Sequence, residues 1–107
     1  MNPARALDCL GDPTRRTVFE RLRSGPMSVG EIAETMTISR PAVSQHLALL
    51  KEAGLVKNEP VGTRRVYYID PHGLSVVRAW FDQFWDQALM SFQVEVARRV
   101  QSEEKDS

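Results

Sequence analysis

The chain has 107 residues, of which 42% are hydrophobic and 26% charged, a balance that is typical of a folded protein of one domain. A formal net charge of zero excludes a general polyelectrolyte attraction to nucleic acid, and the single cysteine, Cys9, excludes an internal disulfide. No apolar run has the length of a signal peptide or a transmembrane helix, so we expect a cytoplasmic protein that does not contact a membrane.

Two helices are predicted in the first quarter of the chain. The first covers about residues 4–10 and ends at Gly11. Asp12 then has the position of an N-cap, with Pro13 at the first position of a second helix that reaches about Arg23. Gly25 and Pro26 stop this helix.

A third helix is predicted from about Val29 to Met36. Ser28 and Glu31 match the S-x-x-E capping box, which is a specific start signal. Thr37 and Ile38 form a short turn after this helix.

A fourth helix follows the turn, with Ser39 as its cap and Gly54 suited to its C′ position. Val43, Leu47 and Leu50 recur at helical spacing and form its core stripe. Two helices joined by so short a turn are typical of a helix-turn-helix, whose second helix enters the major groove of DNA.

The outer face of the fourth helix carries the predicted DNA contacts. Gln45 suits a bidentate pair with adenine, Ser44 a base edge or phosphate, and Arg40 a phosphate or guanine. Lys51 suits a phosphate, while His46 flanks the core side and either packs there or reaches a phosphate. The predicted contact residues on this helix are Ser39, Arg40, Pro41, Ser44, Gln45, His46 and Lys51.

Two strands, at about 55–59 and 64–70, are predicted around residues 60–63. A hairpin just after a recognition helix is a wing, and Arg64 and Arg65 at its tip suit the minor groove or backbone phosphates. Residues 36–69 carry five basic side chains against two acidic ones, so the basic excess coincides with this surface.

A long helix is predicted over about 72–102, followed by a polar tail at 103–107. Apolar and aromatic side chains recur along it every three or four residues, and a second copy of the chain is the expected partner for this stripe. The stripe residues in the predicted dimer interface are Leu74, Val77, Phe81, Phe84, Trp85, Ala88 and Phe92.

Three stretches resemble the ArsR/SmtB family of winged-helix repressors: LGDPTRRTVFERL (10–22), ISRPAVSQHLALLKEAGLV (38–56) and GTRRVYYID (62–70). The resemblance implies a mainly α-helical fold with about five helices and a two-stranded wing, in a single domain over 1–102. It also implies a homodimer built from the first and last helices, which adds Leu7 and Leu10 to the interface. Such a dimer binds an imperfect inverted repeat and usually represses nearby genes.

The sensing sites of the family do not transfer to this chain. The third helix, EIAETM, has no Cys-x-Cys pair, and Asp70 and His72 are followed by Gln83 and Asp86 where a zinc site needs an imidazole. We therefore expect no metal and no cofactor, with Asp70 and His72 capping the last helix.

Two further hypotheses concern an effector. Cys9 is either a buried apolar residue or a redox switch, and the aromatic stripe is either a dimer core or a pocket for an apolar effector. No effector is identified.

The sequence thus predicts a homodimeric, DNA-binding transcriptional repressor. An enzyme is not expected, because no nucleophile, base and acid come together in the sequence. The alternatives are a winged-helix module that binds proteins, or a regulator that responds to an effector or to redox state through Cys9 or the last helix.

Overall fold

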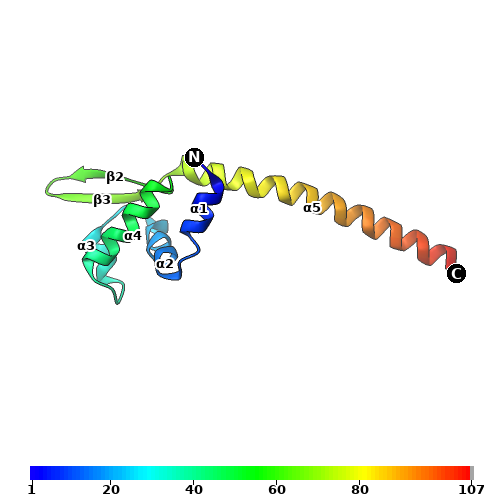
Figure 1. Ribbon diagram of the computed structural model, residues 1–107, viewed down its shortest axis with the longest axis horizontal. Coiled ribbons are helices and arrows are strands. Elements are labelled where there is room, and N and C mark those ends of the chain that lie inside the picture. The colour runs from blue at the N-terminus through cyan, green and yellow to red at the C-terminus, as the bar shows by residue number, and fades with distance from the viewer. Residues whose placement is uncertain (107) are drawn as a thin grey trace. The chain divides into compact units, whose positions relative to one another are not determined.

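The computed structural model describes residues 1–106 and is mainly helical (Figure 1). The chain forms two units, Met1–Val77 and the part from Arg78 onward. The helices are α1 (Pro3–Cys9), α2 (Pro13–Arg21), α3 (Val29–Glu34), α4 (Arg40–Glu52) and α5 (Pro71–Asp106), with a short 3₁₀ helix at Leu22–Ser24; the strands are β1 (Met27–Ser28), β2 (Val56–Val61) and β3 (Arg64–Ile69).

The predicted caps begin α2, α3 and α4. The Asp12 side chain accepts a hydrogen bond from the amide of Arg15 at the start of α2, at 3.0 Å. The Ser28–Glu31 capping box is complete at α3, and the hydroxyl of Ser39 accepts from the Ala42 amide at α4. Each cap satisfies an amide that has no partner within its helix, so the boundaries follow from local chemistry.

Helix α4 ends in a Schellman motif at Gly54. The amide of Leu55 donates to the carbonyl of Leu50 and the amide of Gly54 to that of Lys51, both at 3.0 Å. Gly54 has a φ of 82°, as the C′ position requires. Its carbonyl lies directly against the Cα of Gly73 in the first turn of α5, where any side chain would collide with it.

The sheet has one strand more than the sequence predicts. Its order is β1-β3-β2, all antiparallel, with β1 pairing Ser28 opposite Val66 of β3. The hairpin loop is also shorter than the predicted 60–63, because the ladder continues through Pro60 and Val61. A two-residue loop remains, and its first residue, Gly62, has the positive φ of 63° that such a turn needs.

The core of the first unit is formed by side chains from α1, α2, α3, α4 and the start of β2. The α4 stripe of Val43, Leu47 and Leu50 is fully buried, as predicted. Helix α4 contacts α1, α2, α3 and β2, so its buried face anchors the helix while its opposite face is free. The whole cluster is Ala6, Cys9, Val18, Leu22, Ile32, Val43, Leu47, Leu50, Leu55 and Val56.

Helix α5 is continuous from Pro71 to Asp106. The helix therefore continues past its expected end near residue 102, because Gln, Glu and Lys are strong helix formers. The polar tail at 103–107 stays a prediction, and Ser107 lies outside the described residues. None of the helices within residues 1–106 has the length and apolar character that a membrane crossing requires.

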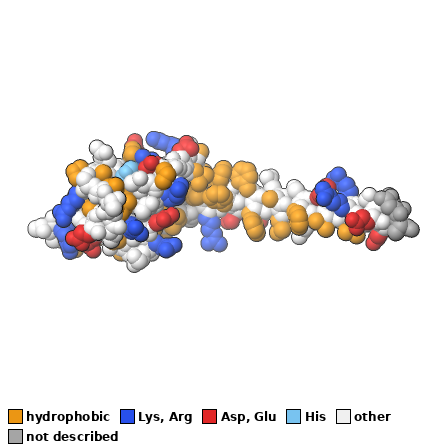
Figure 2. All heavy atoms as spheres, turned by 90° about the horizontal axis from the view of Figure 1, so that it is seen from below, with side chains coloured by type: hydrophobic (Ala, Val, Ile, Leu, Met, Phe, Trp, Pro, Cys, Tyr) orange, Lys and Arg blue, Asp and Glu red, His pale blue; other side chains and the backbone are white. Residues whose placement is uncertain are grey.

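Apolar side chains are exposed in a row along α5 (Figure 2). Trp85 is 69% exposed and Phe92 67% exposed. Among the other predicted interface residues, Leu74, Phe81, Phe84 and Ala88 are exposed, whereas Leu7, Leu10 and Val77 are half-buried. Leu10 and Val77 pack against the core of their own chain, so part of their apolar surface is already covered.

Candidate nucleic-acid interface

The outer face of α4 is a continuous polar surface. Its core stripe is buried, and this orientation turns the predicted contact residues away from the protein. The side-chain amide of Gln45 and the hydroxyl of Ser44 make no hydrogen bond within residues 1–106. Both groups therefore keep their capacity to bind a base edge. The exposed residues of this surface are Ser39, Arg40, Pro41, Ser44, Gln45, Ala48 and Lys51.

His46 differs from these residues because its ring is turned toward α2. Its Nδ1 lies 3.8 Å from the Asp12 carboxylate, and the side chain is only 21% exposed. Nδ1 is buried and makes no hydrogen bond. The ring therefore packs beside the start of α2, and a phosphate contact from His46 stays a prediction.

The two wing arginines are held by different parts of the fold. Arg65 donates to the side chain of Asn58 on the neighbouring strand, at 2.7 Å. Arg64 lies 3.5 Å from the carboxylate of Glu31 on α3. Both guanidinium groups are thus placed beside the helix-turn-helix before any ligand is present.

A surface pocket of about 290 Å³ lies between the start of α3 and the wing. The guanidinium of Arg40 comes from α4 and lies against Gly30, where an added Cβ would be 3.2 Å from Nη2. Arg64 and Arg65 complete the basic part of the lining, and Glu31 and Glu34 are also in it. Three guanidiniums around one pocket are suited to a phosphate, which accepts several charge-assisted hydrogen bonds.

Sequence reasoning missed Glu31 and Asn58 as partners of these arginines. Glu31 was interpreted only as part of a capping box, and its reach to Arg64 depends on how β1 pairs with β3. Asn58 is diagonal to Arg65 only in the register set by the two-residue loop. The dipeptide Gly62-Thr63 is compatible with a two-residue hairpin loop, and a prediction of that loop would have placed Asn58 beside Arg65.

The residues considered for a zinc site are used in other ways. Asp70 accepts a hydrogen bond from the amide of His72 at 3.0 Å and so caps α5, as predicted, and its other oxygen lies 3.9 Å from Nζ of Lys57. The predicted capping role of His72 was wrong, because His72 lies inside α5 and its amide is the group that Asp70 caps. Within residues 1–106 no three His, Cys, Asp or Glu side chains come together at a distance suited to a metal.

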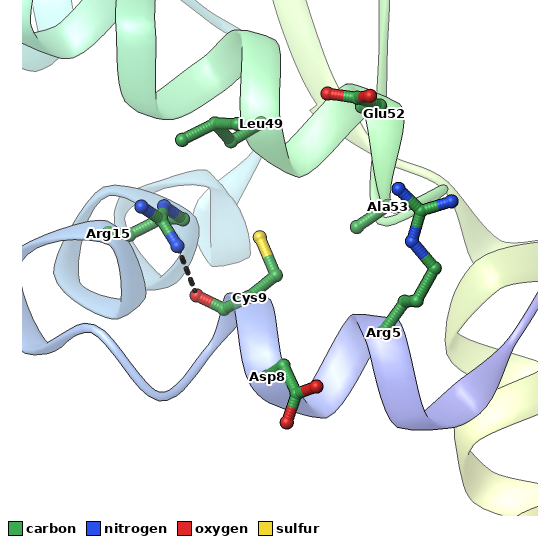
Figure 3. A pocket seen from close by; sticks show the side chains of 7 residues that line it. All are labelled: Arg5, Asp8, Cys9, Arg15, Leu49, Glu52 and Ala53. Atoms are coloured by element: carbon green, nitrogen blue, oxygen red, sulfur yellow. Dashed lines mark hydrogen bonds between the residues drawn. The ribbon is translucent and has the colours of Figure 1, made fainter.

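Cys9 faces a pocket of about 270 Å³ between α1, α2 and α4 (Figure 3). Its carbonyl accepts a hydrogen bond from Nη1 of Arg15 at 3.1 Å, and the side chain is buried. Burial raises the pKa of the Cys9 thiol, although the neighbouring Arg15 opposes the shift. A raised pKa disfavours the reactive thiolate, so redox switching through Cys9 stays a hypothesis without added support.

The comparisons with known proteins agree with this arrangement. A family model described as a helix-turn-helix domain matches residues 10–59. The chain is 49% identical over 106 residues to the HTH-type transcriptional regulator Rv2034 of Mycobacterium tuberculosis, covering 99% of this chain and 95% of that protein. This chain belongs to the ArsR/SmtB family of winged helix-turn-helix regulators.

One further relative matches part of the chain, and one solved structure matches most of it. The transcriptional repressor SdpR of Bacillus subtilis is 41% identical over 59 residues, which cover 55% of this chain and 64% of SdpR. A homodimeric winged helix-turn-helix DNA-binding domain from Mycobacterium bovis superposes with a TM-score of 0.64 at 28% identity, covering 80% of both chains. As a member of this family, the chain is a DNA-binding transcription regulator and not an enzyme.

Proposed function

We propose that this protein is a sequence-specific repressor that binds an inverted-repeat operator as a homodimer in the cytoplasm. The observation that carries the proposal is the exposed polar face of α4 beside a basic wing. Gln45 and Ser44 would contact base edges, while Arg40, Lys51 and the wing arginines would hold phosphates. Ser39 and Pro41 belong to the same proposed surface, whereas a contact from His46 would require its ring to turn away from α2.

The second copy of the chain is proposed to pair through the first and last helices. The exposed apolar stripe on α5 is expected to be buried against a partner, since a monomer rarely exposes so many large apolar side chains to water. The relative from Mycobacterium bovis is a homodimer, which supports a pair of chains in this protein as well. We propose that residues 1–102 act as one domain whose long helix joins the two copies.

Repression would follow from occupation of the promoter. A two-fold dimer places its recognition helices in successive major grooves, about 34 Å apart. A bound dimer would therefore cover about two turns of the duplex and keep the polymerase out.

The test is a gel shift with the DNA upstream of the protein's own gene and of its neighbours. We expect a single retarded species at nanomolar protein concentration that unlabelled specific DNA removes and unrelated DNA does not. Failure to bind any flanking promoter at low salt, where electrostatic contacts are strongest, would contradict the proposal.

A further inference from the structure

Glu31 is held in place by its own capping box. Its Oε1 accepts from the amide of Ser28, and its amide donates to the Ser28 hydroxyl, both at 3.2 Å. The hydrogen bonds from Ser28 lower the pKa of Glu31, so the carboxylate is charged at neutral pH. A fixed, charged carboxylate is thus present at the edge of the proposed DNA-binding surface.

The same Oε1 atom is the partner of Arg64 at the wing tip. Nη1 of Arg64 lies 3.5 Å from it, and both side chains are largely exposed, at 65% and 47%. A carboxylate and a phosphate bind the same guanidinium donors, so one anion takes the place of the other. An exposed ion pair of this kind is weak enough for DNA to displace.

We propose that Glu31 is a positioning residue that holds Arg64 in the DNA-free protein and competes with DNA phosphates for it. The inference rests on the proposed DNA-binding function. Arg64 already lines the same pocket as Arg40 and Arg65, so release from the carboxylate frees a third guanidinium there to bind a phosphate. Glu31 competes with the phosphates of the DNA backbone and not with bases. It therefore lowers the affinity of the protein for DNA of any sequence.

The test is fluorescence anisotropy of wild type and Glu31→Gln on operator and scrambled duplexes over a range of NaCl concentrations. Glutamine keeps an oxygen that accepts from the Ser28 amide, so the cap is retained. We expect the variant to bind both duplexes about 2- to 5-fold more tightly for each copy of the chain bound, the range that one exposed ion pair accounts for. The slope of log affinity against log salt should change by less than about 0.9, the value of one whole phosphate contact, because Arg64 reaches a phosphate in both proteins.

Glu34→Gln is the matched control. Glu34 lines the same pocket and has no ion pair with Arg64 within residues 1–106. This variant removes one negative charge without releasing Arg64, so its binding should change less than that of Glu31→Gln. An equal gain from both variants would show a plain charge effect and overturn the inference.

A double-mutant cycle with Arg64→Gln decides whether the effect acts through that residue. We expect the gain from Glu31→Gln to disappear in the Arg64→Gln background. Glu31→Asp keeps the negative charge but has a shorter side chain that does not reach Arg64 as well. It should therefore show part of the gain in DNA affinity, and it serves as a second variant if glutamine weakens the cap. No gain from either variant, or an equal gain without Arg64, would overturn the inference.

The two proposals fail in different ways. Wild-type protein that binds no duplex would overturn the proposed function together with this inference. Wild-type binding to the operator, with a gain that is independent of Arg64, would overturn the inference alone.

Discussion

At the residue scale, Gln45 is the side chain that we propose reads most of the DNA sequence. It is exposed in the middle of the α4 face, and a glutamine side-chain amide suits a pair of hydrogen bonds with adenine. We predict that Gln45→Ala weakens operator binding by about 1–3 kcal/mol for each of the two half-sites, the value of one bidentate base contact per copy, and leaves binding to scrambled DNA nearly unchanged. Anisotropy on both duplexes measures the difference.

The control for this variant is Gln101→Ala, which makes the same change at an exposed position on α5. It should bind the operator like the wild type. Equal losses from the two variants, or a loss on scrambled DNA as large as on the operator, would contradict base readout by Gln45.

Glu31 gives a second prediction, on pH. Hydrogen bonds from Ser28 lower the pKa of Glu31 below its ordinary value of 4.5. A carboxyl with a lowered pKa in the folded state stabilises the fold above its unfolded pKa, and this stabilisation is lost as the pH falls through the folded value. A ¹³C NMR titration should place the midpoint of Glu31 below 4.5, and Ser28→Ala should raise it. A wild-type midpoint at or above 4.5 would contradict the lowered pKa, and a midpoint that Ser28→Ala leaves unchanged would assign the shift to the backbone amide of residue 28, which the variant keeps.

At the scale of elements, the contact between Gly73 and the Gly54 carbonyl determines how closely α5 approaches the end of α4. Helix propensity alone predicts that Gly73→Ala stabilises α5, by up to about 1 kcal/mol. We predict the opposite sign, because the new Cβ collides with backbone atoms that a rotamer change cannot move; a loss of about 1–3 kcal/mol is expected. Thermal or urea unfolding measures it.

Ser75→Ala is the control, since it changes an exposed residue in the same turn of α5. Its free energy of unfolding should stay within about 0.5 kcal/mol of the wild type. A Gly73→Ala variant that is as stable as the wild type would contradict the close packing.

The elements also show which features a single sequence reveals. The starts of α2, α3 and α4 were predictable because a cap involves residues only two or three apart, as Asp12 and Ser39 do. Strand β1 was not, because two residues carry no periodic pattern and their partner, β3, lies almost forty residues further on. The exposed face of α4 followed from its core stripe, whereas the partners of Arg64 and Arg65 depend on strand register.

At the scale of the whole molecule, the apolar stripe of α5 is proposed to hold the dimer together. Phe92 is exposed on this stripe, and placing a charge there would bury an unpaired carboxylate in the interface. We predict that Phe92→Glu shifts the protein from dimer to monomer at micromolar concentration, as measured by analytical ultracentrifugation. Operator affinity should fall with it, because two linked recognition helices bind more tightly than one.

Met90→Glu is the control for this variant. Met90 is 66% exposed, and a rotation of 100° per residue places it on the face of α5 opposite Phe92. This variant should remain dimeric. Dimers with Phe92→Glu, or monomers with both variants, would contradict the proposed role of the stripe.

A hydroxyl-radical footprint of the wild-type protein on its upstream DNA tests the central claim most directly. Two copies that each place one α4 in the major groove predict two protected patches of similar strength, related by the inverted repeat and centred about 10 base pairs apart. A single protected patch, or uniform weak protection along the fragment, would contradict a homodimer that reads DNA through paired recognition helices.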